Sequence, residues 1–150
     1  MHEPIASVGS GVFIPLSPAP RLLLPIDAVK VSAGFPSPAA DYEESRLDIN
    51  EYLVRNPVST FFFPVQGDSM EGAEIHDGDI LVVDKSVRAC HGRIVIAFID
   101  GQRLVKRLYH RAGRVALLAE NPDYPPLEIR EGMELIVWGV VVGKFKRFCT

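Results

Sequence analysis

The sequence predicts a mostly β protein, in which a compact domain with a strongly bent or closed sheet follows an extended N-terminal arm. Short apolar runs alternate with turn signals from residue 59 onward, as they do in all-β domains. Seven of the 12 prolines fall in the first 38 residues, which show no useful helical or strand periodicity. A chain of 150 residues, 47% of them hydrophobic, can bury one core of ordinary size.

On this pattern the chain divides into three parts. Residues 1–40 form the extended arm, residues 41–58 a short helix and hinge, and residues 59–150 the β domain. We expect Asp48 to cap the short helix and the Asn56–Pro57 pair to stop it. The arm is expected to contribute no strand to the core.

Six apolar runs in the third part are separated by turn signals, and each predicts a short strand. The Asp100–Gly101 pair indicates a two-residue hairpin turn, and Asp77–Gly78 marks another turn. Strands this short and this regularly spaced favour a sheet that bends back on itself. The predicted strands are Thr60–Gln66, Ile80–Val83, Arg93–Ile99, Arg103–Tyr109, Val115–Ala119 and Leu135–Lys146.

Charge and cysteine content exclude several classes of protein. The net charge of −3 gives no electrostatic footprint for sequence-specific DNA binding, and the basic residues at 144–147 indicate a solvated tail. Two cysteines make no disulfide framework. Cys90 precedes His91, but neighbours in sequence are not thereby neighbours in a site, so a thiol protease is not favoured.

The longest uncharged stretch, Pro4–Pro20, is broken by prolines and glycines, which excludes a membrane-spanning helix there. No Lys or Arg precedes it, so it lacks the positive start of a secretory signal. We therefore expect a cytoplasmic protein with no membrane contact.

A candidate nucleophile follows the first predicted strand, in Gly67-Asp68-Ser69-Met70. Gly67 permits a tight backbone path, so that Ser69 projects from a turn. Taken alone, the motif is more typical of an ordinary Gly-Asp-Ser turn than of a nucleophile.

Lys106 gives the serine a possible partner. The strand period of two places Lys106 on one face with Leu104 and Leu108, while Arg103 and Arg107 point to the other face. The alternative is that Lys106 lays its stem on the sheet and extends its ammonium to water. A lysine kept in an apolar setting has a depressed pKa, and its neutral amine can take the proton of a serine hydroxyl.

An ordered series of motifs resembles the peptidase domain of the LexA/UmuD family, from about residue 23 to the end of the chain. The region from Ala33 to Tyr42 is similar to the cleavage region of the UmuD branch in particular. The loop at residues 71–75 departs from the family pattern, in which a glycine often stands closer to the isoleucine. The series comprises Gly67–Met70, His76–Asp79, Ile80–Asp84, Val105–Leu108, Glu120–Pro126 and Trp138–Val141.

The resemblance implies a self-cleaving serine peptidase with a Ser69–Lys106 dyad that cuts its own Ala33–Gly34 bond. The backbone N–H groups of Ser69 and Met70 would bind the oxyanion. No metal or other cofactor is implied. The His76, Asp77, Asp79 and Asp84 side chains fit a turn entering a strand better than a metal-ligand set.

The UmuD resemblance also implies partners. The active form would be a homodimer of residues 34–150, serving a UmuC-type translesion DNA polymerase in the SOS response, with the RecA–single-stranded DNA filament as the trigger for cleavage. Leu23-Leu24-Pro25-Ile26 stands where that branch carries a short apolar stretch linked to the replication clamp.

Two other functions share this chemistry. A self-cleaving LexA-like repressor would need a helix-turn-helix domain, for which the 33 residues before the cut leave no room. A processing peptidase of the signal-peptidase type would need a membrane anchor, which the sequence does not show.

Overall fold

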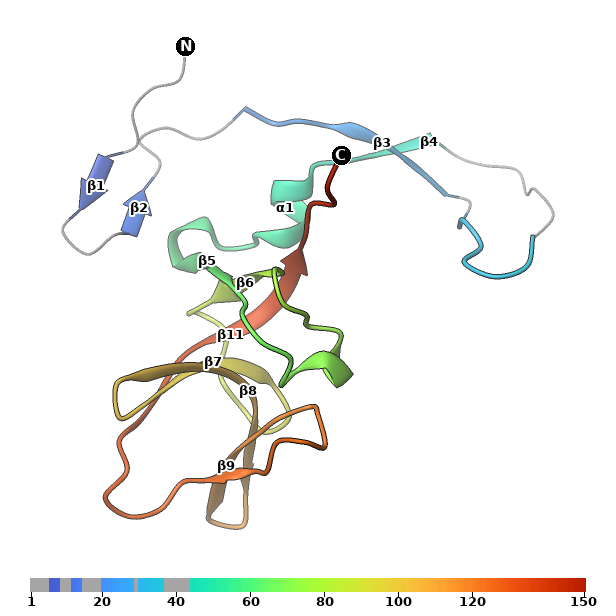
Figure 1. Ribbon diagram of the computed structural model, residues 1–150. Coiled ribbons are helices and arrows are strands. Elements are labelled where there is room, and N and C mark those ends of the chain that lie inside the picture. Colours follow the sequence, from blue (N-terminus) through green and yellow to red (C-terminus); the bar gives the residue numbers. More distant parts are fainter. Residues whose placement is uncertain (1–5, 9–11, 15–19, 29, 37–43) are drawn as a thin grey trace. The chain divides into compact units, whose positions relative to one another are not determined.

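The computed structural model describes residues 6–8, 12–14, 20–28, 30–36 and 44–150 (Figure 1). The chain divides into two compact units, Met1–Tyr52 and Leu53–Thr150. The boundaries that the sequence suggested at residues 40 and 58 remain predictions. Across the described ranges, no helix is both long and apolar enough to cross a membrane.

The second unit is built on one antiparallel seven-stranded sheet with the order β10-β9-β8-β7-β11-β6-β5. The mostly β prediction is therefore confirmed, and all six predicted strands are present. The two-residue strand β10 was not predicted. The elements of this unit are η1 (Pro57–Ser59), β5 (Thr60–Pro64), η2 (Glu71–Ala73), β6 (Ile80–Asp84), β7 (Ile94–Ile99), β8 (Gln102–Arg111), β9 (Arg114–Leu118), β10 (Leu127–Glu128) and β11 (Leu135–Phe145).

Strand β11 bends the sheet. Its first half pairs with β7 and its second half with β6, with register shifts between Val137 and Gly139 and between Val141 and Gly143. Such bulges bend a strand and increase its twist. Gly139 also permits a close approach, because a Cβ there would lie 2.8 Å from Cγ1 of Val83. The bent sheet that the short strands predicted follows from these two bulges.

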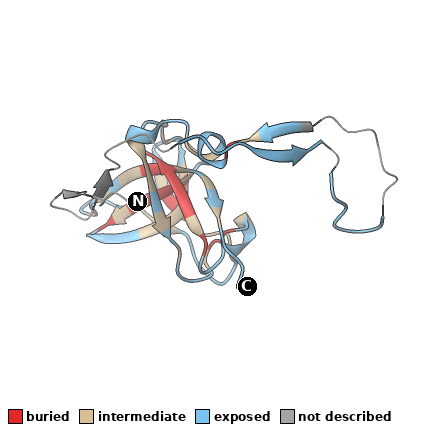
Figure 2. Cartoon of the chain, turned by 90° about the horizontal axis from the view of Figure 1, so that it is seen from above, coloured by how far each residue is buried: buried red, intermediate tan, exposed pale blue. Residues whose placement is uncertain are grey.

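Each face of the sheet carries its own core. Val95 and Ala97 of β7 belong to one cluster, and Ile96 between them belongs to the other, as the alternation of a strand requires. Figure 2 shows in red the stretches of strand in which residues are buried. The Leu108 cluster contains Val95, Ala97, Ile99, Leu108, Leu117 and Val140, and the Met70 cluster contains Met70, Ile75, Leu81, Val83 and Ile96.

The predicted hairpin turn between β7 and β8 is confirmed. Asp100 and Gly101 have φ angles of 47° and 80°, the left-handed pair that a two-residue hairpin turn uses. A second such turn, at Ala112 and Gly113 with φ angles of 51° and 73°, joins β8 to β9.

In the first unit, residues 1–40 contain strands that the sequence did not predict, but, as expected of the arm, none of those described joins the seven-stranded sheet. β3 (Leu24–Asp27) pairs antiparallel with β4 (Glu44–Leu47), and β1 (Ala6–Val8) pairs with β2 (Val12–Ile14). The β3–β4 ladder joins segments far apart in the sequence, neither of which alternates apolar and polar residues. Periodicity within either segment therefore gives no sign of it.

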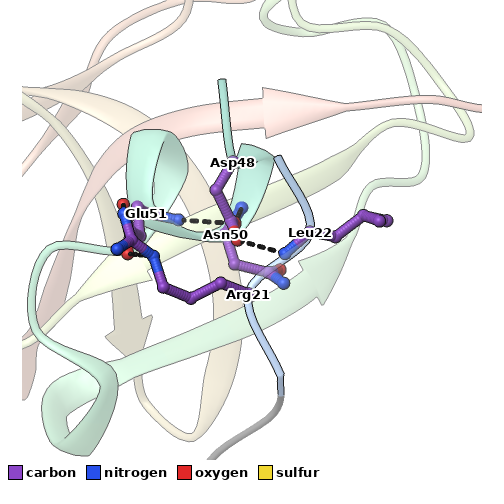
Figure 3. Close-up of polar contacts among 5 residues, drawn as sticks. All are labelled: Arg21, Leu22, Asp48, Asn50 and Glu51. Carbon is purple, nitrogen blue, oxygen red and sulfur yellow. Dashed lines mark hydrogen bonds and ion pairs between the residues drawn. The ribbon is translucent and has the colours of Figure 1, made fainter. Parts of the chain in front are cut away.

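The helix α1 (Ile49–Leu53) begins where the sequence placed it (Figure 3). Oδ1 of Asp48 accepts hydrogen bonds from the backbone N–H groups of Asn50 and Glu51, at 2.8 and 3.2 Å. Oδ2 accepts a third from the N–H of Leu22, at 2.8 Å, and Arg21 forms an ion pair with Glu51 at 2.7 Å. The Leu22 bond is the main cause that lowers the pKa of Asp48. The cap thus also ties residues 21 and 22 to the helix.

Candidate active site

Ser69 lies in the turn that follows β5. The φ angle of Gly67 is 95°, a left-handed conformation that suits glycine, and its N–H donates to Oδ1 of Asp77 at 2.8 Å. The next residue after the serine, Met70, is 2% exposed and packs in the Met70 cluster. Ser69 itself is half-buried. The packing of Met70 in the core therefore fixes the turn that carries Ser69.

Lys106 reaches this turn from the middle of β8. It pairs with the fully buried Val95 of β7, so its stem lies on the sheet face that carries Leu104 and Leu108, as the strand period predicted. Its Nζ atom is 2.5 Å from Oγ of Ser69. The structure thus brings together the two residues that the sequence singled out as nucleophile and base.

The surroundings of Lys106 favour its neutral form. Burial lowers the pKa of its ammonium below the usual 10.5 of lysine, because the charged form loses hydration. Among the described residues no carboxylate forms an ion pair with it, and its Nζ atom lies 5.5 Å from the centroid of the Tyr124 ring. An amine in this state can accept the proton of the Ser69 hydroxyl.

Two backbone N–H groups next to the serine side chain are available to a substrate. The N–H of Glu71 donates to the carbonyl of Asp68 at 3.3 Å, which closes a turn with Ser69 and Met70 at its centre. Neither the N–H of Ser69 nor that of Met70 has an acceptor among the described residues. Paired, unoccupied donors next to a nucleophile are what an oxyanion requires.

The segment after β9 is hydrogen-bonded to the serine turn. The N–H of Glu120 donates to the carbonyl of Ser69 at 2.9 Å, and its carbonyl accepts from the N–H of Gly72 at 2.7 Å. A Cβ on Gly72 would lie 2.6 Å from that carbonyl oxygen, so glycine is required there. Arg107 binds the Glu120 carboxylate and donates to the carbonyl of Gly92 at 2.7 Å.

Three residues at the site were given no role by the sequence: Glu120, Asn121 and Tyr124. Asn121 Nδ2 donates to the carbonyl of Asp68 at 3.0 Å, and the Tyr124 hydroxyl donates to Asp68 Oδ1 at 2.5 Å. In the sequence these residues were noticed only as part of the Glu120–Pro126 motif that resembles the LexA/UmuD family.

The expected cleavage bond lies in the first unit. Ala33 and Gly34 are exposed, and the N–H of Gly34 donates to Oγ of Ser32 at 3.2 Å, while Ser32 donates to the carbonyl of Phe35. The part of the expected cleavage region from Ser37 to Tyr42 lies outside the described residues.

Of the side chains considered as metal ligands, those of Asp77, Asp79 and Asp84 accept hydrogen bonds from the protein. Asp84 accepts hydrogen bonds from Asn56, Ser59 and Ser86, which lower its pKa to about 2 although burial acts, as the largest single cause, to raise it. Asp79 accepts from the N–H of His76 and pairs with Lys144. No group of three potential ligands occurs in the described part of the chain.

The Cys90 thiol is exposed and accepts a hydrogen bond from Arg93, not from His91.

The sequence of this chain is similar to those of known proteins. The Peptidase S24-like family model matches residues 25–142. Protein MucA of Escherichia coli is 48% identical over 79% of this chain and 81% of its own length, and Protein SamA of Salmonella typhimurium is 49% identical over 78% and 81%. LexA repressor 2 of Geobacter sulfurreducens is 38% identical over 85% of this chain and 62% of its own length. The greater similarity is thus to the UmuD-like proteins, not to the repressor.

Proposed function

This chain belongs to the Peptidase S24-like family and is a self-cleaving serine peptidase, and we propose that Ser69 is its nucleophile and Lys106 its general base. It is an accessory to a translesion DNA polymerase in the SOS response to DNA damage. The observation that carries the assignment is the 2.5 Å contact between Nζ of Lys106 and Oγ of Ser69.

In the proposed reaction, the neutral amine of Lys106 takes the proton of the Ser69 hydroxyl as Oγ attacks the carbonyl carbon of Ala33. The N–H groups of Ser69 and Met70 bind the resulting oxyanion. The intermediate collapses to an ester between Ala33 and Ser69, and the amine of Gly34 leaves with the proton carried by Lys106. Water then hydrolyses the ester, with Lys106 again as the base.

The bond between Ala33 and Gly34 is supported by its chemistry and its exposure. These are the two smallest side chains, so the carbonyl can approach a nucleophile without steric hindrance. Both residues are exposed, and a Cβ on Gly34 would meet nothing within 4 Å. The products are residues 1–33 and 34–150.

Intact mass spectrometry tests this assignment directly. The native protein, incubated with RecA filaments on single-stranded DNA, should yield the two fragments, while Ser69→Ala and Lys106→Ala should stay whole. Both variants should keep the native fold, as checked by circular dichroism, because neither residue belongs to the buried set of either cluster. Cleavage of Ser69→Ala at the native rate would refute the proposed nucleophile.

We also propose specific partners, on the resemblance to the UmuD branch. The cleaved form acts as a homodimer and binds a UmuC-type polymerase, and the RecA–DNA filament triggers the cleavage. With these partners the protein would act in the cytoplasm. The exposed apolar residues Leu23, Leu24 and Ile26 support contact with the replication clamp, since they are 41, 54 and 43% exposed at or beside β3. A pull-down with the clamp, using Leu23→Ala with Leu24→Ala as the comparison, tests that contact.

A further inference from the structure

Two peptide groups carry the proposed oxyanion donors. The N–H of Ser69 shares a planar peptide group with the carbonyl of Asp68, and the N–H of Met70 shares one with the carbonyl of Ser69. In a trans peptide the N–H points opposite to its own C=O. Any contact that fixes one of these carbonyls therefore also fixes the direction of an oxyanion donor.

Both carbonyls are held by the same short segment, which follows β9. Asn121 Nδ2 donates to the carbonyl of Asp68 at 3.0 Å, and the N–H of Glu120 donates to the carbonyl of Ser69 at 2.9 Å. The carbonyl of Asp68 also accepts the longer bond of 3.3 Å from Glu71 within the turn. A carbonyl that accepts a hydrogen bond polarises its amide, which strengthens the N–H of the same peptide group as a donor.

The side chain of Asn121 has only one orientation that satisfies both of its contacts. Its Oδ1 accepts the N–H of Asp123 at 3.0 Å, so its Nδ2 must face the carbonyl of Asp68. The adjoining Glu120 is held by Arg107 and by the N–H of Gly72. The segment at Glu120 and Asn121 is thus fixed by hydrogen bonds on several sides.

We propose that Asn121 is a positioning residue that aims the N–H of Ser69 at the oxyanion of the cleavage reaction. It acts through the peptide group between Asp68 and Ser69. The inference rests on the proposed function, which assigns the two oxyanion donors.

The variant Asn121→Asp separates this role from the local fold. Its carboxylate keeps an acceptor for the N–H of Asp123 but has no donor for the carbonyl of Asp68. The maximal rate of self-cleavage should fall on the order of tenfold to a hundredfold, somewhat less than the loss of a whole oxyanion donor. The pH–rate midpoint is not compared in this variant, because its carboxylate adds a negative charge near Lys106 and so raises the pKa of the amine.

Asn121→Ser gives the same comparison without a new charge. The serine hydroxyl can accept from the N–H of Asp123 but is too short to reach the carbonyl of Asp68. We expect a fall in rate similar to that of Asn121→Asp. In both variants the amide resonance of Ser69 should shift more than that of Met70, whose peptide group is still held by Glu120.

Tyr124→Phe is the matched control. It removes a bond of 2.5 Å from the same segment to the same residue, but that bond ends on the side chain of Asp68 and leaves both carbonyls held. The ring beside Lys106 also remains. This variant should cleave at a rate close to the native one.

Ser69→Ala, measured in parallel, distinguishes the possible failures. If Ser69→Ala still cuts itself, the proposed nucleophile is wrong. If Ser69→Ala is inert while both Asn121 variants cleave at the native rate, only the positioning role is overturned. In Asn121→Ser, which adds no charge, the midpoint should stay in place; a midpoint that moves toward the ordinary pKa of lysine would also overturn the positioning role, because the variant would then have acted by opening the site around Lys106.

Discussion

Lys106 and Ser69 are 37 positions apart in the sequence, yet Nζ of the lysine lies 2.5 Å from Oγ of the serine. The contact joins the middle of β8 to the turn after β5, two elements that are not neighbours in the sheet. The lysine stem lies on the face of the Leu108 cluster, and burial lowers the pKa of the amine. The neutral amine that can act as a base toward Ser69 is therefore easier to form.

The first prediction is the pH dependence of spontaneous self-cleavage. Only the neutral amine of Lys106 can take the serine proton, so the rate should rise with pH and become constant above the pKa of Lys106. Since burial depresses that pKa, the midpoint should lie below the usual 10.5 of lysine. First-order rates from gel densitometry across a pH series measure the midpoint. A rate independent of pH would contradict a lysine base.

The second prediction is that Lys106→Arg does not cleave itself at any pH in that series. A guanidinium keeps its charge in proteins and cannot accept the serine proton. Arginine also has a long stem that can lie on the same sheet face, so the fold should survive. Circular dichroism checks the fold, and measurable cleavage by this variant would show that the residue is not a base.

The third prediction concerns the cleaved bond. Gly34→Glu should block self-cleavage, because a bulky charged side chain would have to enter a site that accepts glycine. Val31→Glu is the matched control, since it adds the same charge to the same exposed segment but leaves Ala33 and Gly34 unchanged. N-terminal sequencing of the large native fragment should give Gly34 as its first residue. Any other first residue would show that a different bond is cut.

The fourth prediction is that Gly72→Ala slows self-cleavage and destabilises the second unit. Its Cβ would lie 2.6 Å from the carbonyl oxygen of Glu120, so the bridge between Gly72, Glu120 and Ser69 must shift. Overpacking of this kind costs about 1–3 kcal/mol in the free energy of unfolding. Urea denaturation measures the loss, and Glu71→Ala in the same turn should leave the stability nearly unchanged.

Much of the sheet could be predicted because its signals are local. Asp100–Gly101 marks a hairpin turn by residue type alone, and the alternation of residues along β8 is enough to place Lys106 on one face with Leu104 and Leu108. The cap at Asp48 is equally local. In each case the residues that determine the feature lie within a few positions of one another.

The rest depends on pairing between distant segments. The β3–β4 ladder and the hydrogen bond from Glu120 to Ser69 join residues far apart in sequence, and neither end shows a pattern of its own. The strand β10 has only two residues, too few for a period. The contacts of Asn121 with Asp68 likewise appear only once the chain is folded.

The fifth prediction is that the protein is a dimer before and after cleavage. In β11, Ile136 and Val142 are 50 and 46% exposed, which supports an apolar surface on this strand for a second subunit. Light scattering at micromolar concentration should give twice the chain mass. Ile136→Asp with Val142→Asp should give monomers, whereas Val58→Asp, at an exposed apolar position outside this strand, should not.

A last consequence concerns what self-cleavage uncovers. Neither core contains any of the described residues among the first 33 positions, so the second unit should stay folded when these positions are removed. Their loss takes β3 away from β4 and removes the contacts of Leu22 with Asp48 and of Arg21 with Glu51. The β4 edge and the start of α1 thereby gain new surface.

A product that stays folded and gains a surface can change its affinity for a partner. We therefore expect the chain that begins at Gly34 to bind a UmuC-type polymerase of the same organism more tightly than uncleavable full-length Ser69→Ala does. Pull-downs with equal amounts of each form measure the difference, and a Gly34 chain that also carries Ser69→Ala controls for the substitution. Equal binding by the long and short forms, or binding by neither, would exclude a switch that acts through the arm.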